Sequence, residues 1–162
     1  MHAFTYHCPT EIVFGKDTQL QLAEQIRKYG GSRVLLVYGS GSIERSGLLG
    51  QLCQVLTDGQ IPYELFGGAK ANPTLEHARE GVKLALQSGA DFVIGAGGGS
   101  VIDTAKAIAI GAANAPTDIW EFWIREKTPH RALPVGAVLT ISAAGSESSD
   151  SAVLTNLATG VK

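Results

Sequence analysis

The sequence predicts an α/β fold, built on a doubly wound, Rossmann-like parallel sheet. Residues 33–38 and 133–139 are nearly continuous apolar runs, typical of strands that a parallel sheet buries on both faces. Predicted strands begin about every 30 residues, the length of a βαβ unit. The strand predicted over 91–96 runs directly into a cluster of glycines and then into a helical pattern.

The composition fits one domain over residues 1–162. The chain is 44% hydrophobic and 17% charged, which suits a folded protein with a sizeable core. Its net charge of -2 and the lack of a basic run predict no nucleic acid partner and no attraction to an acidic membrane. No stretch approaches the roughly 20 apolar residues of a membrane span, and the first four residues do not resemble a signal peptide. We therefore expect a cytoplasmic protein.

The cysteines and histidines predict neither a disulfide nor a metal centre. Cys8 and Cys53 are far apart in the sequence, so we expect two reduced, buried thiols. The four histidines lack metal-ligand spacing, and we predict no metal site made by this chain alone. They are His2, His7, His77 and His130.

The first 60 residues predict short β-type runs followed by a helix, a strand and a second helix. The β-type runs lie around Phe4, Tyr6 and 12–14. A helix then begins near residue 15 and ends at two glycines, and the strand at 33–38 follows. Beyond a G-S-G-S turn, one helix is predicted, with apolar residues from Ile43 to Leu56 on one side.

The next part of the chain repeats this alternation. A strand at 61–66 leads to a helix over 75–86, which Asn72, Pro73 and Thr74 cap. Small polar residues thus follow three predicted strands, at 39–42, at Asn72 and at 97–100. Carboxyl ends of parallel strands meet at one edge, so we expect a crevice suited to a dinucleotide. Turn and N-cap roles also explain the serines of 39–42 and Asn72.

Residues 90–106 are the centre of the prediction. Glycines let the backbone approach a ligand, and the N–H groups of a first helical turn attract an anion, so a phosphate site is expected at 97–100. Another interpretation is a turn in which Ser100 caps the helix and Asp103 completes a capping box. The two interpretations are compatible.

After residue 115 the pattern predicts an aromatic turn or short helix over 118–123 and the strand at 133–139. The hydroxyl-rich loop 140–149 can line the crevice, and its lack of G-x-S-x-G argues against a hydrolase. A further strand is predicted at 151–155, and a return strand opens at 161–162, where the sequence stops. We expect a domain truncated at its C-terminal end.

Several motifs occur in one order and cover nearly the whole chain. They are Y-G-S-G-S at 38–42, N-P at 72–73, G-G-G-S-V-I-D-T-A-K at 97–106, D-I-W-E-F at 118–122, and L-T followed by G-S-E-S within 139–148. This set resembles the iron-containing (group III) alcohol dehydrogenase family, most closely its NADPH-dependent butanol dehydrogenase branch. The resemblance implies a dehydroquinate synthase-like N-terminal domain that binds the dinucleotide, without the family's helical metal-binding domain.

The resemblance also implies the chemistry and the site. The family transfers hydride between NAD(P)H and an aldehyde or ketone, with a divalent metal, iron or zinc, held by the helical domain. We therefore expect no catalytic or metal-binding residue here, and no activity from this chain alone. In this resemblance, 97–100 bind the pyrophosphate, Thr140 and Ser142 lie near the nicotinamide, and Lys162 reaches a ribose. The full set of expected cofactor-binding residues is Gly39, Ser40, Ser42, Asn72, Gly97, Gly98, Gly99, Ser100, Asp103, Thr140, Ser142 and Lys162.

The end of the first strand bears on cofactor choice. Family members that prefer NAD tend to carry an acidic residue there, which would repel a 2′-phosphate. Here Gly39 and Ser40 follow Tyr38, and the next acid is Glu44, so NADP(H) is predicted over NAD(H). A simple turn role for Gly39 explains the glycine equally well.

Two alternatives to the alcohol dehydrogenase stay open. One is a stand-alone nucleotide-binding module without catalysis, and the other is a relative of dehydroquinate synthase or the polyol-phosphate dehydrogenases. For the first hypothesis we expect a small alcohol or aldehyde as substrate, and a homodimer that uses edge strands near 4–14 as pairing surfaces.

Overall fold

A parallel, four-stranded sheet lies at the centre of the computed structural model, which describes residues 3, 5 and 7–162. The strand order is β2-β1-β3-β4, and each neighbouring pair is parallel. The strands are β1 (Val34–Gly39), β2 (Tyr63–Ala69), β3 (Phe92–Gly97) and β4 (Val135–Leu139). The predicted Rossmann-like α/β fold is confirmed.

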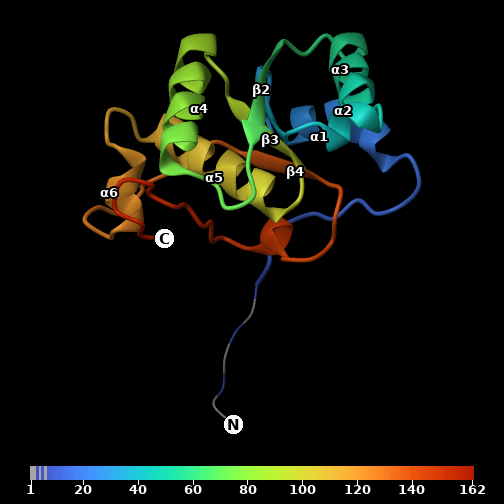
Figure 1. The fold of residues 1–162 in the computed structure, drawn as a ribbon. Coiled ribbons are helices and arrows are strands. Elements are labelled where there is room, and N and C mark those ends of the chain that lie inside the picture. The colour runs from blue at the N-terminus through green and yellow to red at the C-terminus, as the bar shows by residue number, and fades with distance from the viewer. Residues whose placement is uncertain (1–2, 4, 6) are drawn as a thin grey trace.

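Helices cover both faces of this sheet (Figure 1). On one side lie the 3₁₀ turn η1 (Thr18–Gln21), α1 (Leu22–Lys28), α2 (Ser42–Arg45) and α3 (Leu48–Asp58). On the other side lie α4 (Leu75–Ser88), α5 (Gly99–Ala113) and α6 (Ile119–Trp123). A second 3₁₀ turn, η2 (Ser146–Ser148), lies in the loop after β4. Among the described helices, none is long and apolar enough to cross a membrane.

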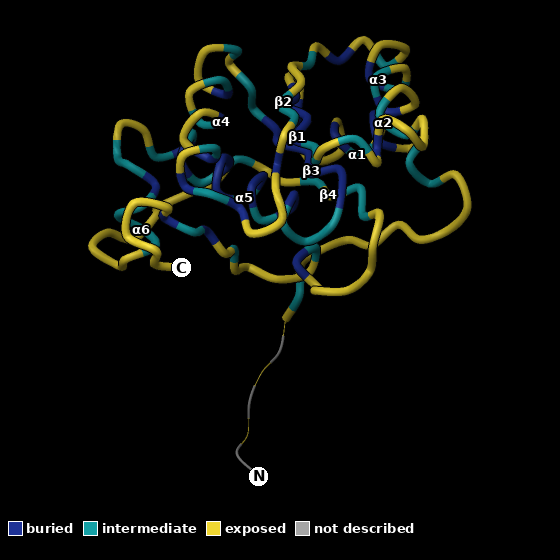
Figure 2. The backbone as a smooth tube through the Cα atoms, in the orientation of Figure 1, coloured by how far each residue is buried: buried dark blue, intermediate teal, exposed yellow. Residues whose placement is uncertain are grey.

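The continuous apolar run of β1 serves two cores. Val34 and Leu36 pack with α1 and α3, whereas Leu35 and Val37 pack with α4 and α5. All four side chains are fully buried, and each contributes about 1.5–3 kcal/mol through the hydrophobic effect. Figure 2 shows this burial along the strands and the inner sides of the helices. By contrast, β4 pairs only with β3 as described, and Val135 is 36% exposed, so the expectation of burial on both faces was wrong for that strand.

The predicted β-type run at 12–14 was wrong. These residues form no strand, and the Phe14 side chain is 98% exposed. Their β propensity has no effect here because no described strand lies beside them to pair with. Phe4 and Tyr6, which carried the rest of this prediction, lie outside the described residues. The helix predicted after residue 15 exists as η1 followed by α1.

The single helix predicted after Ser42 is two helices. Gly47 separates α2 from α3 with a φ of 78°, in the left-handed region. Such a residue cannot continue an α-helix, and glycine adopts this conformation at little cost. Beyond the break, Leu52 and Leu56 of α3 pack in one core cluster with residues of β1.

The segment after β4 is mostly irregular. The strand predicted at 151–155 is reduced to one parallel bridge between Thr74 and Thr155, and 161–162 form no strand. The short aromatic helix predicted at 118–123 is confirmed as α6, whose N-terminus is closed by a capping box of Asp118 and Glu121.

Candidate functional site

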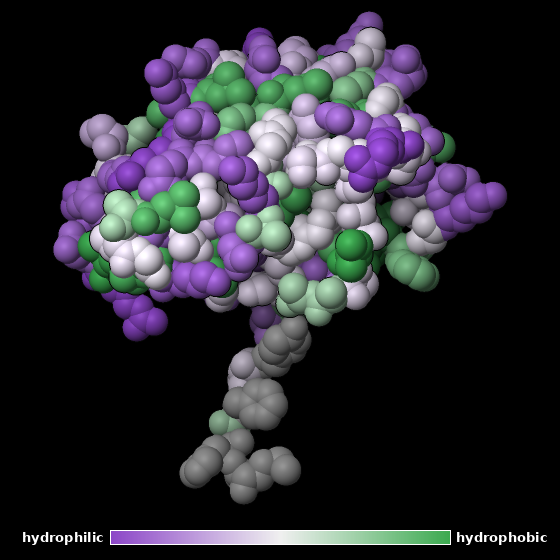
Figure 3. All heavy atoms as spheres, viewed as in Figure 1, coloured by the Kyte–Doolittle hydropathy of each residue, from purple (hydrophilic) through white to green (hydrophobic). Residues whose placement is uncertain are grey.

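The connections that leave β1 and β3 run in opposite directions across the sheet. From β1 the chain crosses to β2 through α2 and α3 on one face, and from β3 it crosses to β4 through α5 on the other. Ligands of open parallel sheets bind beyond the carboxyl ends of the strands at such a switch point. Tyr38 pairs with Ala96, so the strand ends Gly39 and Gly97 lie side by side at this point. Pale spheres of intermediate hydropathy gather in the middle of the face shown in Figure 3.

The predicted cofactor-binding residues gather at this edge. Ser40 and Ser42 follow β1, Asn72 follows β2, and Thr140 and Ser142 follow β4. The register brings the four strand ends together, because Gly39 pairs with Ala69 and Gly97 pairs with Leu139. The expected rim of small polar residues therefore exists, and its role in binding a cofactor stays a prediction.

The turn between β3 and α5 exposes backbone without side chains at the carboxyl edge of the sheet. The N-cap of α5 is Gly98, in an extended conformation with φ -86° and ψ -174°. The capping box predicted for Ser100 and Asp103 was wrong, because Ser100 already lies inside the helix and no side chain caps it. The helix therefore leaves the N–H groups of its first turn available to an external acceptor.

Two adjacent glycines of this turn have different roles. A Cβ at Gly97 would lie 2.6 Å from Cγ2 of Val101, so this glycine allows α5 to pack closely on β3. A Cβ at Gly98 would meet no atom within 4 Å. Packing therefore does not require glycine there, and the space in front of the helix N-terminus is open.

Asn72 and Lys162 are 90 residues apart in the sequence, yet they touch. The Lys162 Nζ donates a hydrogen bond to Asn72 Oδ1 at 3.1 Å. Asn72 does not cap α4, as the sequence had predicted, because the N-cap is Thr74, whose Oγ1 accepts from the backbone N–H of His77 at 3.4 Å. Asn72 instead has a φ of 58°, a conformation that asparagine tolerates, and its side chain stays at the rim.

Asp103 and Lys106 hold the loop after β4 against α5. Ser146 Oγ donates to Asp103 Oδ1 at 2.5 Å, and the Val153 N–H donates to Asp103 Oδ2 at 3.0 Å. Lys106 Nζ donates to Ser146 Oγ at 3.1 Å, and to the carbonyl oxygens of Ser149 at 2.7 Å and Ser151 at 2.8 Å.

This cluster surrounds Ser146, which is only 7% exposed. Burial lowers the pKa of Lys106, although the carboxylates of Asp103, Asp150 and Glu147 act in the opposite direction. Lys106 was given no separate role from the sequence. Its position three residues after Asp103 could have indicated a shared role, because this spacing puts both side chains on the same side of the helix.

The described residues build no metal centre, since no group of three or more His, Cys, Asp or Glu side chains gathers among them. His77 stacks on Phe66 instead, with ring centroids 4.4 Å apart, and burial lowers its pKa. His2 lies outside the described residues.

The sequence matches the family model described as iron-containing alcohol dehydrogenase over residues 9–162. The chain belongs to the iron-containing alcohol dehydrogenase family. This result confirms the family resemblance indicated by the motifs.

Relatives within the alcohol dehydrogenase family differ in their cofactor. The chain is 42% identical to the probable NADH-dependent butanol dehydrogenase 2 of Bacillus subtilis and 41% identical to the NADPH-dependent aldehyde reductase YqhD of Escherichia coli. Both alignments cover 100% of this chain and 41% of the relative, so the chain spans less than half the length of these proteins. The predicted preference for NADP(H) therefore stays a prediction.

Solved structures of the family share the fold. The NADH-dependent butanol dehydrogenase A of Thermotoga maritima superposes with a TM-score of 0.95 at 42% identity, over 98% of this chain and 40% of that protein. A crystal structure of Escherichia coli YqhD gives a TM-score of 0.87 at 36% identity.

Proposed function

We propose that this chain is the cofactor-binding part of a metal-dependent alcohol dehydrogenase or aldehyde reductase, which transfers hydride between NADP(H) and an alcohol or aldehyde. The observation that carries the proposal is the bare backbone of Gly98 at the switch point between β1 and β3. The proposal further includes a homodimeric, cytoplasmic enzyme that binds neither nucleic acid nor membranes.

Different residues of the rim bind different parts of the cofactor. The first N–H groups of α5, at Gly99 and Ser100, donate to the diphosphate, and the dipole of this 15-residue helix favours its negative charge. Asn72 and Lys162, already in contact, hold a ribose, whereas Thr140 and Ser142 lie toward the nicotinamide end. A nicotinamide bound there would donate hydride to an aldehyde or accept it from an alcohol, and these residues supply no ligand set for the family's divalent metal, iron or zinc.

The loop held by Asp103 and Lys106 gives this arrangement its rigidity. Both side chains arise from α5, the same helix whose N-terminus faces the diphosphate. The residues that approach the nicotinamide end are therefore fixed relative to those that bind the phosphates. A pre-organised site of this kind loses less entropy when the cofactor binds.

The substitution Gly98→Ala tests the proposal. The extended backbone of Gly98 suits alanine and its Cβ meets no protein atom, so we expect the melting temperature to change by less than about 2 °C. The methyl group would occupy the space proposed for the diphosphate. We expect the affinity for NADPH, measured by calorimetric titration, to fall by about tenfold or more.

Gly50→Ala is the matched control. Gly50 lies in α3, away from the rim, and a Cβ there also meets no atom within 4 Å. This variant should bind NADPH like the unmodified chain. Equal NADPH affinity of the Gly98→Ala variant and the unmodified chain would contradict the proposal, as would a lack of measurable binding by the unmodified chain.

A further inference from the structure

Helix α2, which follows the loop after β1, ends in an arginine that forms no ion pair within residues 3, 5 and 7–162. Arg45 ends α2, and its side chain folds back over the loop, so that a Cβ at Gly41 would lie 2.6 Å from Arg45 Nη1 and 3.5 Å from Cζ. Arg45 is exposed, and among the described residues no ion pair includes it, although Glu44 is its neighbour in sequence. Its charge is therefore available to a ligand.

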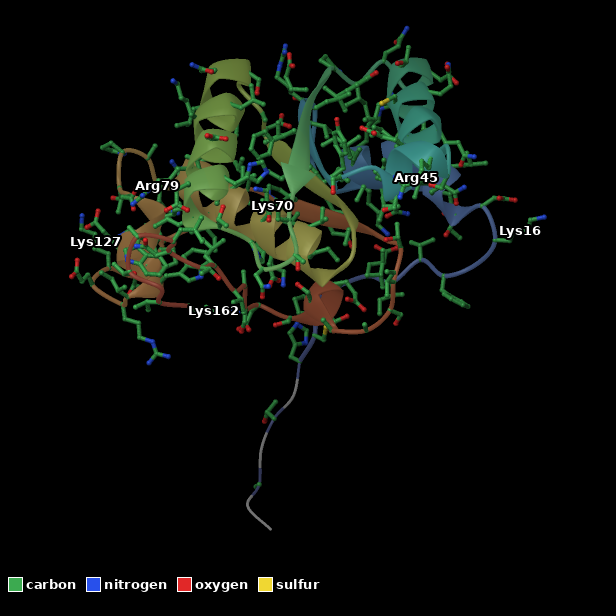
Figure 4. The ribbon with its side chains drawn as sticks, viewed as in Figure 1. Lys16, Arg45, Lys70, Arg79, Lys127 and Lys162 are labelled. Atoms are coloured by element: carbon green, nitrogen blue, oxygen red, sulfur yellow. The ribbon has the colours of Figure 1, made fainter. Side chains whose placement is uncertain are left out.

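The guanidinium lies at the carboxyl end of β1, beside Gly41. Gly41 is the second residue beyond Gly39, where β1 ends, and the guanidinium lies against it. Figure 4 shows Arg45 on the α2 side of the sheet, whereas Lys70 lies between the two helical layers. The Arg45 guanidinium lies close to Gly41 of the loop 39–42.

The strand order indicates which part of a dinucleotide this loop would meet. With the diphosphate at the β3 turn and the nicotinamide toward β4, the adenosine half extends in the other direction, over β1. A 2′-substituent on the adenosine ribose would then lie beside Ser40, Gly41 and Arg45. This step rests on the function proposed above.

We propose that Arg45 binds the 2′-phosphate of NADP(H) and so determines the cofactor preference. A guanidinium presents paired N–H donors that match two phosphate oxygens, and such charge-assisted pairs are among the strongest hydrogen bonds in proteins. Ser40 lies in the loop before α2, and Ser42 is the first residue of α2. Both residues are exposed, so their hydroxyl groups can donate to the remaining oxygen. No acidic residue occupies 39–43 to repel the phosphate.

The test compares two small ligands that differ only in the 2′-phosphate. Adenosine 2′,5′-bisphosphate and adenosine 5′-monophosphate are titrated by calorimetry into the unmodified chain and into Arg45→Gln. The unmodified chain should prefer the bisphosphate, and Arg45→Gln should reduce that preference about 10- to 100-fold while leaving the monophosphate affinity unchanged. Arg45→Lys should keep part of the preference, because the charge stays and the paired donors are lost.

Lys16→Gln is the control for net charge. Lys16 is exposed, lies just before η1 and is separate from Arg45 in Figure 4. Removal of its charge should therefore leave the preference for the bisphosphate unchanged. Arg45→Gln with an undiminished preference, or an unmodified chain that binds both ligands equally, would overturn the assignment of Arg45 and leave the dinucleotide site standing. Failure of the unmodified chain to bind either ligand would contradict both this inference and the proposed function.

Discussion

The substitution Lys106→Met tests whether Lys106 anchors the loop after β4 and so stabilises the fold more than an exposed lysine does. Methionine keeps the unbranched stem and removes the three hydrogen bonds to Ser146, Ser149 and Ser151. Each such bond contributes about 0.5–1.5 kcal/mol, and water can replace the lysine at the two exposed carbonyl groups. We therefore expect a loss of about 2 kcal/mol, which corresponds to a fall in melting temperature of about 4–8 °C for a chain of this size.

Thermal unfolding and hydrogen exchange measure this effect together. The Val153 N–H, bound to Asp103, should exchange faster in Lys106→Met, because the loop loses its second anchor on α5. Lys127→Met is the control, since Lys127 pairs with Glu121 at 2.8 Å on the surface and its loss should cost less than about 0.5 kcal/mol. If the two variants unfold within about 0.5 kcal/mol of each other, the reasoning about the anchor is refuted.

Three further predictions follow from contacts elsewhere in the domain. Gly97→Ala, unlike Gly98→Ala, should destabilise the fold by about 1–3 kcal/mol in urea unfolding, because its Cβ would overlap Val101; unchanged stability would show that α5 shifts freely. The hydrogen bonds from Arg79 hold the pKa of Asp118 below its ordinary value, so this carboxylate stabilises the fold above its unfolded-state pKa and the gain is lost as the pH falls through the folded pKa. Stability measured below about pH 4 should therefore fall more steeply in the unmodified chain than in Asp118→Asn, and parallel curves would contradict this. Lys162→Met should weaken NADPH binding several-fold with a change in stability below about 0.5 kcal/mol, whereas intact binding would exclude a role at the ribose.

The sequence predicted best where one local signal agreed with the tertiary structure. The strand β1 was recognised because a strand buried on both faces must consist almost entirely of apolar residues. The turn after β3 was recognised because close packing of the helix on the strand requires glycine. The run at 12–14 has similar residues but belongs to no sheet, and its local sequence does not show that a neighbouring strand is lacking.

Other features depended on interactions between distant residues. Asp103 was assigned to a helix cap, because Ser100 stands three residues before it, and to the cofactor-binding residues. Its two carboxylate oxygens instead accept hydrogen bonds from Ser146 and Val153. The helix break at Gly47 was missed because a glycine within an apolar pattern is also tolerated in a continuous helix. The common rim was predictable, since parallel strands align their carboxyl ends, but the order β2-β1-β3-β4 that locates the switch point was not.

Helix α5 fixes the distance between the turn after β3 and the loop after β4. Its first turn and Lys106 are separated by about seven residues, or roughly 10 Å along the axis. Since a helix neither stretches nor shortens appreciably, the distance between the N-terminus of α5 and the loop that Lys106 holds stays constant. A shift of the whole helix would therefore move the turn after β3 and the loop after β4 together.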